Sequence, residues 1–177
     1  PLTQPLEVAR VTAFVFRAPI GTPVVTSFGV MHDRPAVLVR LEDRAGATGW
    51  GEIWANFPSC GAEHRARLVI TAAGPLLLGR FDDPAQATTR LERALHILAL
   101  QSGEWGPFAQ VLAGVDIALW DLAARRAALP LAELLGGSPR PVPAYASGIN
   151  LDEAVAAVAR CRSDGHRGFK IKVGFDR

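Results

Sequence analysis

The stretch "PFAQVLAGVDIALWDLAARRAALPLAELLGG", residues 107–137, decides the fold of the larger part of this chain. Its apolar residues recur at helical spacing, which predicts a long helix with one continuous buried face. Pro130 restarts a short helix, and Gly136 and Gly137 end it, because glycine readily adopts the backbone conformation that follows a helix. The face expected to be buried consists of Val111, Val115, Ala118, Leu119 and Leu122.

Two helices are expected ahead of this one. Residues 61–79, "GAEHRARLVITAAGPLLLG", have helical apolar spacing, with an expected break at Gly74 and Pro75. Residues 83–100, "DPAQATTRLERALHILAL", begin with Asp83 as the expected N-cap and Pro84 at the first helical position. Proline suits that position because the N–H that it lacks would have no partner there.

The N-terminal third of the chain predicts strands. Residues 7–17, 35–43 and 50–55 alternate in the manner of β-strands, and together they predict a three-stranded antiparallel meander. Between the first two lies "APIGTPVVTSFGVMHDR", residues 18–34, which is rich in Gly, Pro and Thr and predicts a long loop. Loops longer than about 12–15 residues without secondary structure are usually functional or disordered.

The pattern changes after Gly137. Several prolines precede an expected strand at residues 142–147, a helix follows at 151–163, and "FKIKVG" predicts a second strand. A strand, a crossover helix and a strand within about 30 residues make a βαβ unit with parallel strands. We therefore expect two domains, residues 1–137 and residues 138–177.

Composition and charge exclude several classes of function. The chain has 177 residues, of which 49% are hydrophobic and 20% charged, and its net charge is +2, so we expect no nucleic-acid partner. No apolar run reaches the 18 or so residues of a membrane span, and the first residues do not resemble a signal peptide. Cys60 and Cys161 form no metal or disulfide pattern. A cytoplasmic protein without a membrane partner is expected.

Two lysines stand out near the C-terminal end of the sequence. Lys170 and Lys172 are the only lysines among the 177 residues, and they alternate with Phe169, Ile171 and Val173. They therefore share one face of the expected strand. Two ammonium groups so close together lower the pKa of at least one, which a lysine base needs near neutral pH. The alternative is a solvent-facing strand edge, where lysines are common.

Four segments, taken in order, resemble the mandelate racemase and muconate lactonizing enzyme branch of the enolase superfamily. They are "GATGWGE", "AGVDIALWDLAARRAALPLAELLGG", "PVPAYASG" and "GFKIKVG", and the resemblance extends over residues 7–175. It implies an α+β capping domain, a three-stranded antiparallel meander plus helices, over residues 1–137. It also implies that residues 138–177 are the first βαβ unit of a truncated TIM-type (β/α) barrel.

The resemblance implies a chemistry as well. Enzymes of this superfamily remove the proton α to a carboxylate with the help of Mg²⁺, and this branch carries a Lys-x-Lys motif on the second barrel strand. By resemblance, Lys172 is the general acid/base, and Lys170 helps to neutralise the substrate carboxylate. The substrate contacts implied are Ser147 at the end of the first barrel strand, Phe28, Met31 and His32 in a mobile capping loop, and Trp54, Asn56 and Phe57 in a second specificity loop.

Much of such an enzyme is not represented in these residues. A complete barrel takes about 200–250 residues, and residues 141–177 predict two of its eight strands. The family's acidic metal ligands lie on later strands, so we expect no metal ligand in this chain, and we expect a truncated chain that is inactive alone. When full length, the protein is expected to bind Mg²⁺ and a small carboxylate substrate and to form a homo-oligomer.

Three functions remain open. The stretches "AYASG" and "KIKVG" favour an isomerase or lyase on the mandelate-racemase-like side, which means a racemase or an acid-sugar dehydratase. The second is a muconate-type cycloisomerase or a dipeptide epimerase. The third, of another class, is a non-catalytic oligomerisation module. His32 could also be an exposed histidine without a role, and Trp54, Asn56 and Phe57 could pack at a domain interface.

Overall fold

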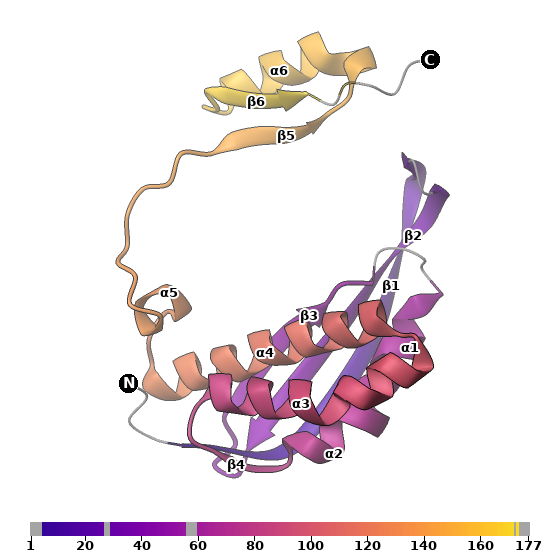
Figure 1. The fold of residues 1–177 in the computed structure, drawn as a ribbon. Coiled ribbons are helices and arrows are strands. Elements are labelled where there is room, and N and C mark those ends of the chain that lie inside the picture. Colours follow the sequence, from indigo (N-terminus) through magenta and orange to yellow (C-terminus); the bar gives the residue numbers. More distant parts are fainter. Residues whose placement is uncertain (1–4, 27–28, 56–59, 172, 174–177) are drawn as a thin grey trace. The chain divides into compact units, whose positions relative to one another are not determined.

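The computed structural model of the protein describes residues 5–26, 29–55, 60–171 and 173. The chain divides into two compact units, Pro1–Gly137 and Ser138–Arg177, and each is described by itself. Figure 1 shows a sheet with helices in the first unit and a smaller βαβ arrangement in the second.

The first unit contains a four-stranded antiparallel sheet. Its strands are β1 (Leu6–Thr26), β2 (Gly29–Asp43), β3 (Thr48–Ile53) and β4 (Gly79–Phe81), in the spatial order β3-β2-β1-β4. The predicted meander is therefore confirmed, and a short fourth strand is added to it. Valines and leucines of β2, among them Val37, Val39 and Leu41, are fully buried on the face that the helices cover (Figure 1).

The prediction of a long loop at residues 18–34 is wrong. In the described residues of this segment, 18–26 and 29–34, β1 and β2 remain paired as antiparallel strands, and Val24 pairs with Met31 and Thr26 with Gly29. Valine and threonine favour extended backbone, and the Thr26 hydroxyl donates a hydrogen bond to the Gly29 carbonyl at 2.8 Å. The Gly and Pro residues mark an interruption of the ladder at residues 20–23, where the two strands lose their regular register.

The helices of the first unit follow the expected order. They are α1 (Gly61–Leu68), a π-helical turn η1 (Val69–Ala73), α2 (Gly74–Leu77), α3 (Pro84–Ser102), α4 (Trp105–Ala127) and α5 (Leu131–Leu134). The expected break at Gly74 and Pro75 is wrong, because the chain stays helical through both residues. Proline cannot donate the usual helical hydrogen bond. The turn before it widens instead, and the Gly74 N–H donates to the Val69 carbonyl.

The predicted start of α3 is confirmed. The Asp83 carboxylate accepts a hydrogen bond from the Gln86 backbone N–H at 2.8 Å, and Pro84 occupies the first helical position. The predicted end of the helical region is confirmed too, because α5 is followed by Gly136 in a left-handed conformation, with φ of 85°. Both boundaries depend on interactions within a few residues.

Helix α4 packs against the backbone of β3, and three glycines permit the close approach. A Cβ atom on Gly49 would lie 2.5 Å from the Leu122 nitrogen, and one on Gly51 would overlap the carbonyl oxygen of Gly114. A Cβ atom on Gly114 would in turn lie 3.0 Å from the Glu52 carbonyl oxygen. The Asp121 carboxylate of α4 accepts a hydrogen bond from the Trp50 backbone N–H of β3 at 2.8 Å.

The buried face predicted for α4 is confirmed, since its five residues are at most 1% exposed. By length and composition, α4 is also apolar enough to cross a membrane, although half of that stretch is buried inside the first unit. Burial against β3 and α3 explains its apolar composition.

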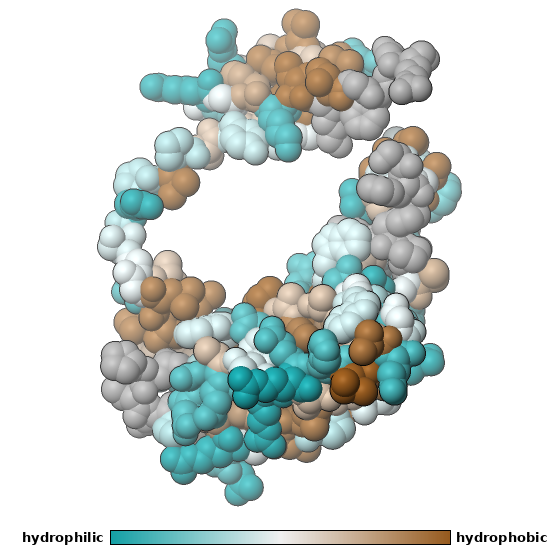
Figure 2. Space-filling view, in the orientation of Figure 1, coloured by the Kyte–Doolittle hydropathy of each residue, from teal (hydrophilic) through white to brown (hydrophobic). Residues whose placement is uncertain are grey.

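The second unit is a parallel strand pair with a crossover helix. It consists of β5 (Tyr145–Ile149), a 3₁₀ turn η2 (Leu151–Glu153), α6 (Ala154–Ser163) and β6 (Gly168–Ile171), so the predicted βαβ arrangement is found. The first strand begins three residues later than expected, after Pro143, which has no N–H for a strand ladder. Apolar side chains remain exposed on this unit (Figure 2), among them Val155 at 88% and Val173 at 74%.

Candidate functional site

The βαβ unit brings two predicted site residues to one place. Ala146 pairs with Phe169 and Ile149 with Ile171, so the intervening residues Ser147 and Gly148 lie opposite Lys170. Both Ser147 and Lys170 are exposed. The expected position of Ser147 at the end of its strand is wrong, because β5 continues to Ile149, whereas Lys170 is the penultimate residue of β6. Parallel sheets commonly carry functional side chains near the carboxyl ends of their strands. Lys172 lies outside the described residues.

The residues predicted for the capping segment differ in exposure. Met31 lies in β2, pairs with Val24, and is 8% exposed, so its side chain is buried. His32 is exposed and lies opposite the interruption in β1. Phe28 lies outside the described residues.

The second predicted specificity segment leads from the sheet into α1. Trp54 directly follows β3 and is 51% exposed within its unit. Asn56 and Phe57 lie outside the described residues. The segment ends at Cys60, which occupies the N-cap position of α1 without accepting a side-chain hydrogen bond.

Three consecutive side chains of α1 contact residues outside that helix, in β1 and at α4, which the sequence reasoning missed. Glu63 binds Arg17 of β1, and His64 Nε2 lies 2.6 Å from Glu104 Oε1 at the start of α4. Arg65 donates to the side-chain oxygen of Gln110 in α4 at 2.6 Å. Successive helical residues point about 100° apart, so the run "EHR" is the signal that could have indicated three separate contacts.

The cluster around Arg17 joins two strands and a helix. The Arg17 guanidinium donates to both carboxylate oxygens of Glu63, at 2.7 Å each from one nitrogen, and to Asp33 of β2 at 3.2 Å. These hydrogen bonds raise the pKa of Arg17, and the bond from Arg17 lowers the pKa of Glu63. Both groups therefore remain charged at neutral pH, and the base of the β1–β2 hairpin is tied to α1.

Arg65 is a buried cation whose hydrogen-bond acceptors are uncharged. Its side chain is 5% exposed, it also donates to the Gly61 carbonyl at 2.8 Å, and burial lowers its pKa. A side chain on Gly61 would collide with this guanidinium. Arg65 therefore fixes the first turns of α1 against α4.

Another arginine, Arg40, lies on the outer face of the sheet against two aromatic rings. The Arg40 guanidinium lies 5.5 Å from the centre of the Phe14 ring and 5.6 Å from that of Trp50. The two rings stack with centroids 5.6 Å apart. Cation–π contacts of this kind stabilise neighbouring strands without a carboxylate partner.

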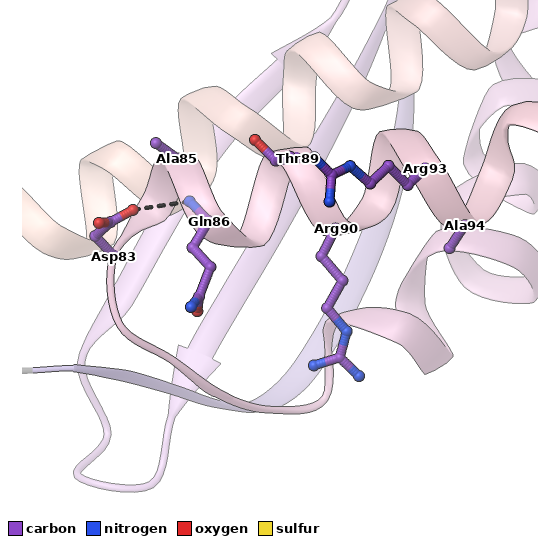
Figure 3. A pocket seen from close by; sticks show the side chains of 7 residues that line it. All are labelled: Asp83, Ala85, Gln86, Thr89, Arg90, Arg93 and Ala94. Atoms are coloured by element: carbon purple, nitrogen blue, oxygen red, sulfur yellow. Dashed lines mark hydrogen bonds between the residues drawn. The ribbon is translucent and has the colours of Figure 1, made fainter.

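A surface depression in the first unit is lined by none of the residues predicted for the site. Figure 3 shows a shallow depression along α3, in which Arg90 and Arg93 point in different directions. Arg90 lies over the Phe81 ring at 5.5 Å. Over the part of the chain that the structure describes, no three His, Cys, Asp or Glu side chains cluster in a way that could hold a metal ion.

Solved structures match nearly the whole length of this chain. A mandelate racemase/muconate lactonizing enzyme from Bordetella bronchiseptica RB50 matches 98% of this chain and 45% of its own, with 55% identity and a TM-score of 0.86. An enolase from Bradyrhizobium, solved with magnesium and mandelic acid, matches 99% of this chain and 48% of its own, with 29% identity and a TM-score of 0.81.

Sequence relatives point in the same direction. A 3,6-anhydro-alpha-L-galactonate cycloisomerase of Streptomyces coelicolor is 34% identical over 94% of this chain and 46% of its own length. A D-galactarolactone cycloisomerase of Agrobacterium fabrum is 30% identical over 96% of this chain and 45% of its own. The chain thus spans about half the length of the relatives it matches.

The family assignment rests on the first unit. Residues 10–136 match the family described as "Mandelate racemase / muconate lactonizing enzyme, N-terminal domain". This range includes all of the sheet except the first residues of β1, together with helices α1 to α5, so the match extends over most of the chain. The chain therefore belongs to the mandelate racemase/muconate lactonizing enzyme family of the enolase superfamily, as its sequence motifs indicate.

Proposed function

We propose that the full-length protein is an isomerase or lyase that removes the proton α to a carboxylate. The observation that carries this proposal is the sequence Lys170-Ile171-Lys172 in a chain of this family, with Lys170 on β6 exposed opposite Ser147. A solvent-facing strand edge would explain the lysines equally well in an unrelated protein. It does not explain their position on the strand that carries this motif in the family.

We assign different roles to Lys172 and Lys170. Lys172 acts as the general acid/base, which takes the proton from the α-carbon and returns it. Lys170 places a positive charge beside the substrate carboxylate and makes removal of the α-proton easier, because the carbanionic product carries extra negative charge there. Ser147 lies within reach of the same carboxylate in this proposal.

The proposed substrate is a small carboxylate of the sugar-acid type. Relatives include a "D-galactonate dehydratase family member" of Streptomyces and a D-mannonate dehydratase of Rhizorhabdus wittichii, and their names support dehydration. The names of the two cycloisomerases support a second candidate, cycloisomerisation of a sugar-acid derivative. A hydrophobic dipeptide epimerase is also a relative, at 34% identity. Proton abstraction α to a carbonyl group is the step we propose for this chain in each case.

Magnesium is proposed as the cofactor of the full-length protein. The described residues do not fit a magnesium site, since they contain no cluster of carboxylates, and hard cations require several oxygen ligands. We therefore propose that its ligands lie outside these 177 residues and derive no step through the ion. When bound, magnesium would supply positive charge opposite the substrate carboxylate. The Bradyrhizobium structure, with magnesium and mandelic acid, supports this proposal by analogy.

The cellular compartment and the assembly of the protein are also proposed from its relatives. The relatives carry the names of enzymes that act on small molecules, and we propose a soluble protein of the cytoplasm that assembles as a homo-oligomer. A purely non-catalytic oligomerisation module would leave the exposed Lys170 and its neighbour without a role.

The test is isotope exchange catalysed by the full-length protein. Sugar acids and their lactones are incubated with the enzyme in deuterated buffer, and proton NMR follows loss of the α-proton. Lys172→Ala should reduce exchange by at least the ~10²–10⁴-fold typical of a general base. Arg160→Ala, on α6 of the same unit, serves as the control and should leave exchange unchanged. Full exchange in a folded Lys172→Ala variant would contradict the assignment.

A further inference from the structure

The two faces of the sheet in the first unit differ in burial. Along β2, Val37 and Val39 are fully buried under the helices, whereas Leu38 and Arg40, which alternate with them, are partly exposed. Successive side chains of a strand point to opposite faces, and residues that pair directly across two strands share a face. The register therefore defines an outer patch on the face away from the helices, which consists of Phe14, Phe16, Leu38, Arg40, Trp50 and Glu52.

The aromatic rings of the outer patch are stacked in order. The Phe14 ring lies between those of Phe16 and Trp50, with centroids 6.2 Å and 5.6 Å away, and Phe16 is 54% exposed. The Arg40 guanidinium lies against Phe14 and Trp50, and among the described residues its buried Nε has no hydrogen-bond acceptor. Aromatic residues and arginine are the types enriched at protein interfaces, so this arrangement favours a docking surface.

Two opposite charges on the outer patch lack a partner. Within the described ranges, neither Arg40 nor Glu52 forms an ion pair, although Arg10 and Glu42 on the same two strands pair with each other. Arg40 lies opposite Trp50, and Glu52 lies opposite Leu38. These four residues form a square on the sheet. Arg40 and Glu52 occupy one diagonal, which spans about 7–8 Å, and Leu38 and Trp50 occupy the other.

This square is complementary to itself. In a two-fold interface the same patch of both molecules meets, so that residue i contacts j and j contacts i. A two-fold axis between two facing sheets, directed along the Leu38–Trp50 diagonal, exchanges the ends of the other diagonal. Arg40 of each copy then meets Glu52 of the other, and Leu38 and Trp50 meet their own counterparts. A second copy therefore supplies the missing partner for both charges.

We propose that the outer patch is the centre of a two-fold interface with a second copy of this chain, joined by two reciprocal Arg40–Glu52 ion pairs. The inference rests on the homo-oligomer of the proposed function and adds the surface and the register of the contact. Specific interfaces involve about 20–30 residues a side, so residues around the outer patch complete the contact. Trp and Arg near the centre of an interface commonly carry most of the binding energy.

Charge reversal tests the interface in the full-length protein, with assembly measured by analytical ultracentrifugation. Arg40→Glu and Glu52→Arg each set like charges against one another at both contacts. Each should raise the dissociation constant at least about tenfold. Arg93→Glu, which reverses an exposed charge on α3 in the helical layer, is the matched control and should leave assembly unchanged. Circular dichroism checks that each variant is folded.

Mixing the two variants makes the test specific for a second copy. One variant carries two acidic groups at these positions and the other carries two basic groups, so both contacts become attractive in a mixed pair. An equimolar mixture should therefore associate about as tightly as the unaltered protein. The double variant Arg40→Glu/Glu52→Arg should regain assembly by itself, since it exchanges the two charges. Glu52→Arg leaves the ring contacts of Arg40 in place and keeps the test decisive if Arg40→Glu does not fold.

Three results would overturn the interface. Unchanged assembly of Glu52→Arg would show that this face is not in the contact. Weakened assembly that neither mixing nor the double variant restores would assign the face to another part of the same chain or to a different protein. A monomeric unaltered protein would remove the proposed homo-oligomer as well. Exchange of the substrate's α-proton by that monomer would still leave the proposed reaction standing, so the two failures are distinguishable.

Discussion

The contact between α4 and β3 predicts different effects for one substitution at two positions of the same helix. Gly106 and Gly114 both lie in α4. A Cβ atom on Gly106 would have nothing within 4 Å, whereas one on Gly114 would collide with the Ile53 side chain and lie 3.0 Å from the Glu52 carbonyl oxygen. Alanine at Gly114, in the interior of the helix, gains helix propensity of roughly 0.5–1 kcal/mol, whereas Gly106 is the second residue of α4 and directly precedes Pro107, so little gain is expected there.

The magnitude at Gly114 follows from what surrounds it. Ile53 is 0% exposed and has little room to move, and the Glu52 backbone is held by its pairing with Leu38 of β2. Overfilling a packed interior costs about 1–3 kcal/mol. We take the upper end of that range, because one of the two obstacles is backbone. After subtraction of the propensity gain, Gly114→Ala should destabilise the protein by about 2 kcal/mol.

Thermal unfolding followed by circular dichroism measures the difference. For a chain of this size, 1 kcal/mol corresponds to a change in Tm of about 2–4 °C. Gly114→Ala should therefore lower Tm by about 4–8 °C, and Gly106→Ala should leave it nearly unchanged. Equal stability of the two variants would refute the argument that α4 contacts the β3 backbone so closely that a methyl group does not fit.

Three further predictions concern single contacts. Asp83→Ala should lower the stability of the first unit by about 1 kcal/mol, measured by urea unfolding, because α3 loses its N-cap. The pKa of Glu63 is lowered from 4.5, so its bond with Arg17 stabilises the folded state above that pH and is lost as the pH falls through the lowered value. The stability difference between the unaltered protein and Glu63→Gln should therefore disappear in acid, and a difference that persists at pH 2 would contradict this assignment. Calorimetric titration should show specific Mg²⁺ binding by the full-length protein and binding no tighter than about millimolar by residues 1–177, because hard cations need several oxygen ligands and the described residues offer no carboxylate cluster.

Local signals predicted much of the fold. The apolar face of α4, the Asp83 cap and the end of α5 near Gly136 each depend on residues a few positions apart, and all three are found. The course of residues 18–34 was not predictable in this way. Pro19 and Gly21 indicate a loop when taken alone, whereas pairing with the strand beyond Gly29 extends the hairpin past them.

The candidate site was predictable in part for the same reason. The position of Lys170 opposite Ser147 follows from the βαβ pattern, because parallel strands of one unit end at one edge. The Arg17–Glu63 contact joins residues 46 positions apart, and no periodicity in the sequence relates them. Contacts of this kind depend on how a helix is placed on a sheet, which a single sequence does not encode in a local pattern.

The hydrogen bond from Trp50 to Asp121 has a consequence for self-association. β3 is an outer strand of its sheet, and an outward-facing N–H would otherwise be free to join a strand of another molecule. Asp121 blocks that position, and the opposite outer strand, β4, is only three residues long. Residues 24–26 of β1 and 29–31 of β2 pair with each other and with neither β3 nor β4 in the described structure, so their outer edges are the place where strand addition, and hence aggregation of the first unit, would begin.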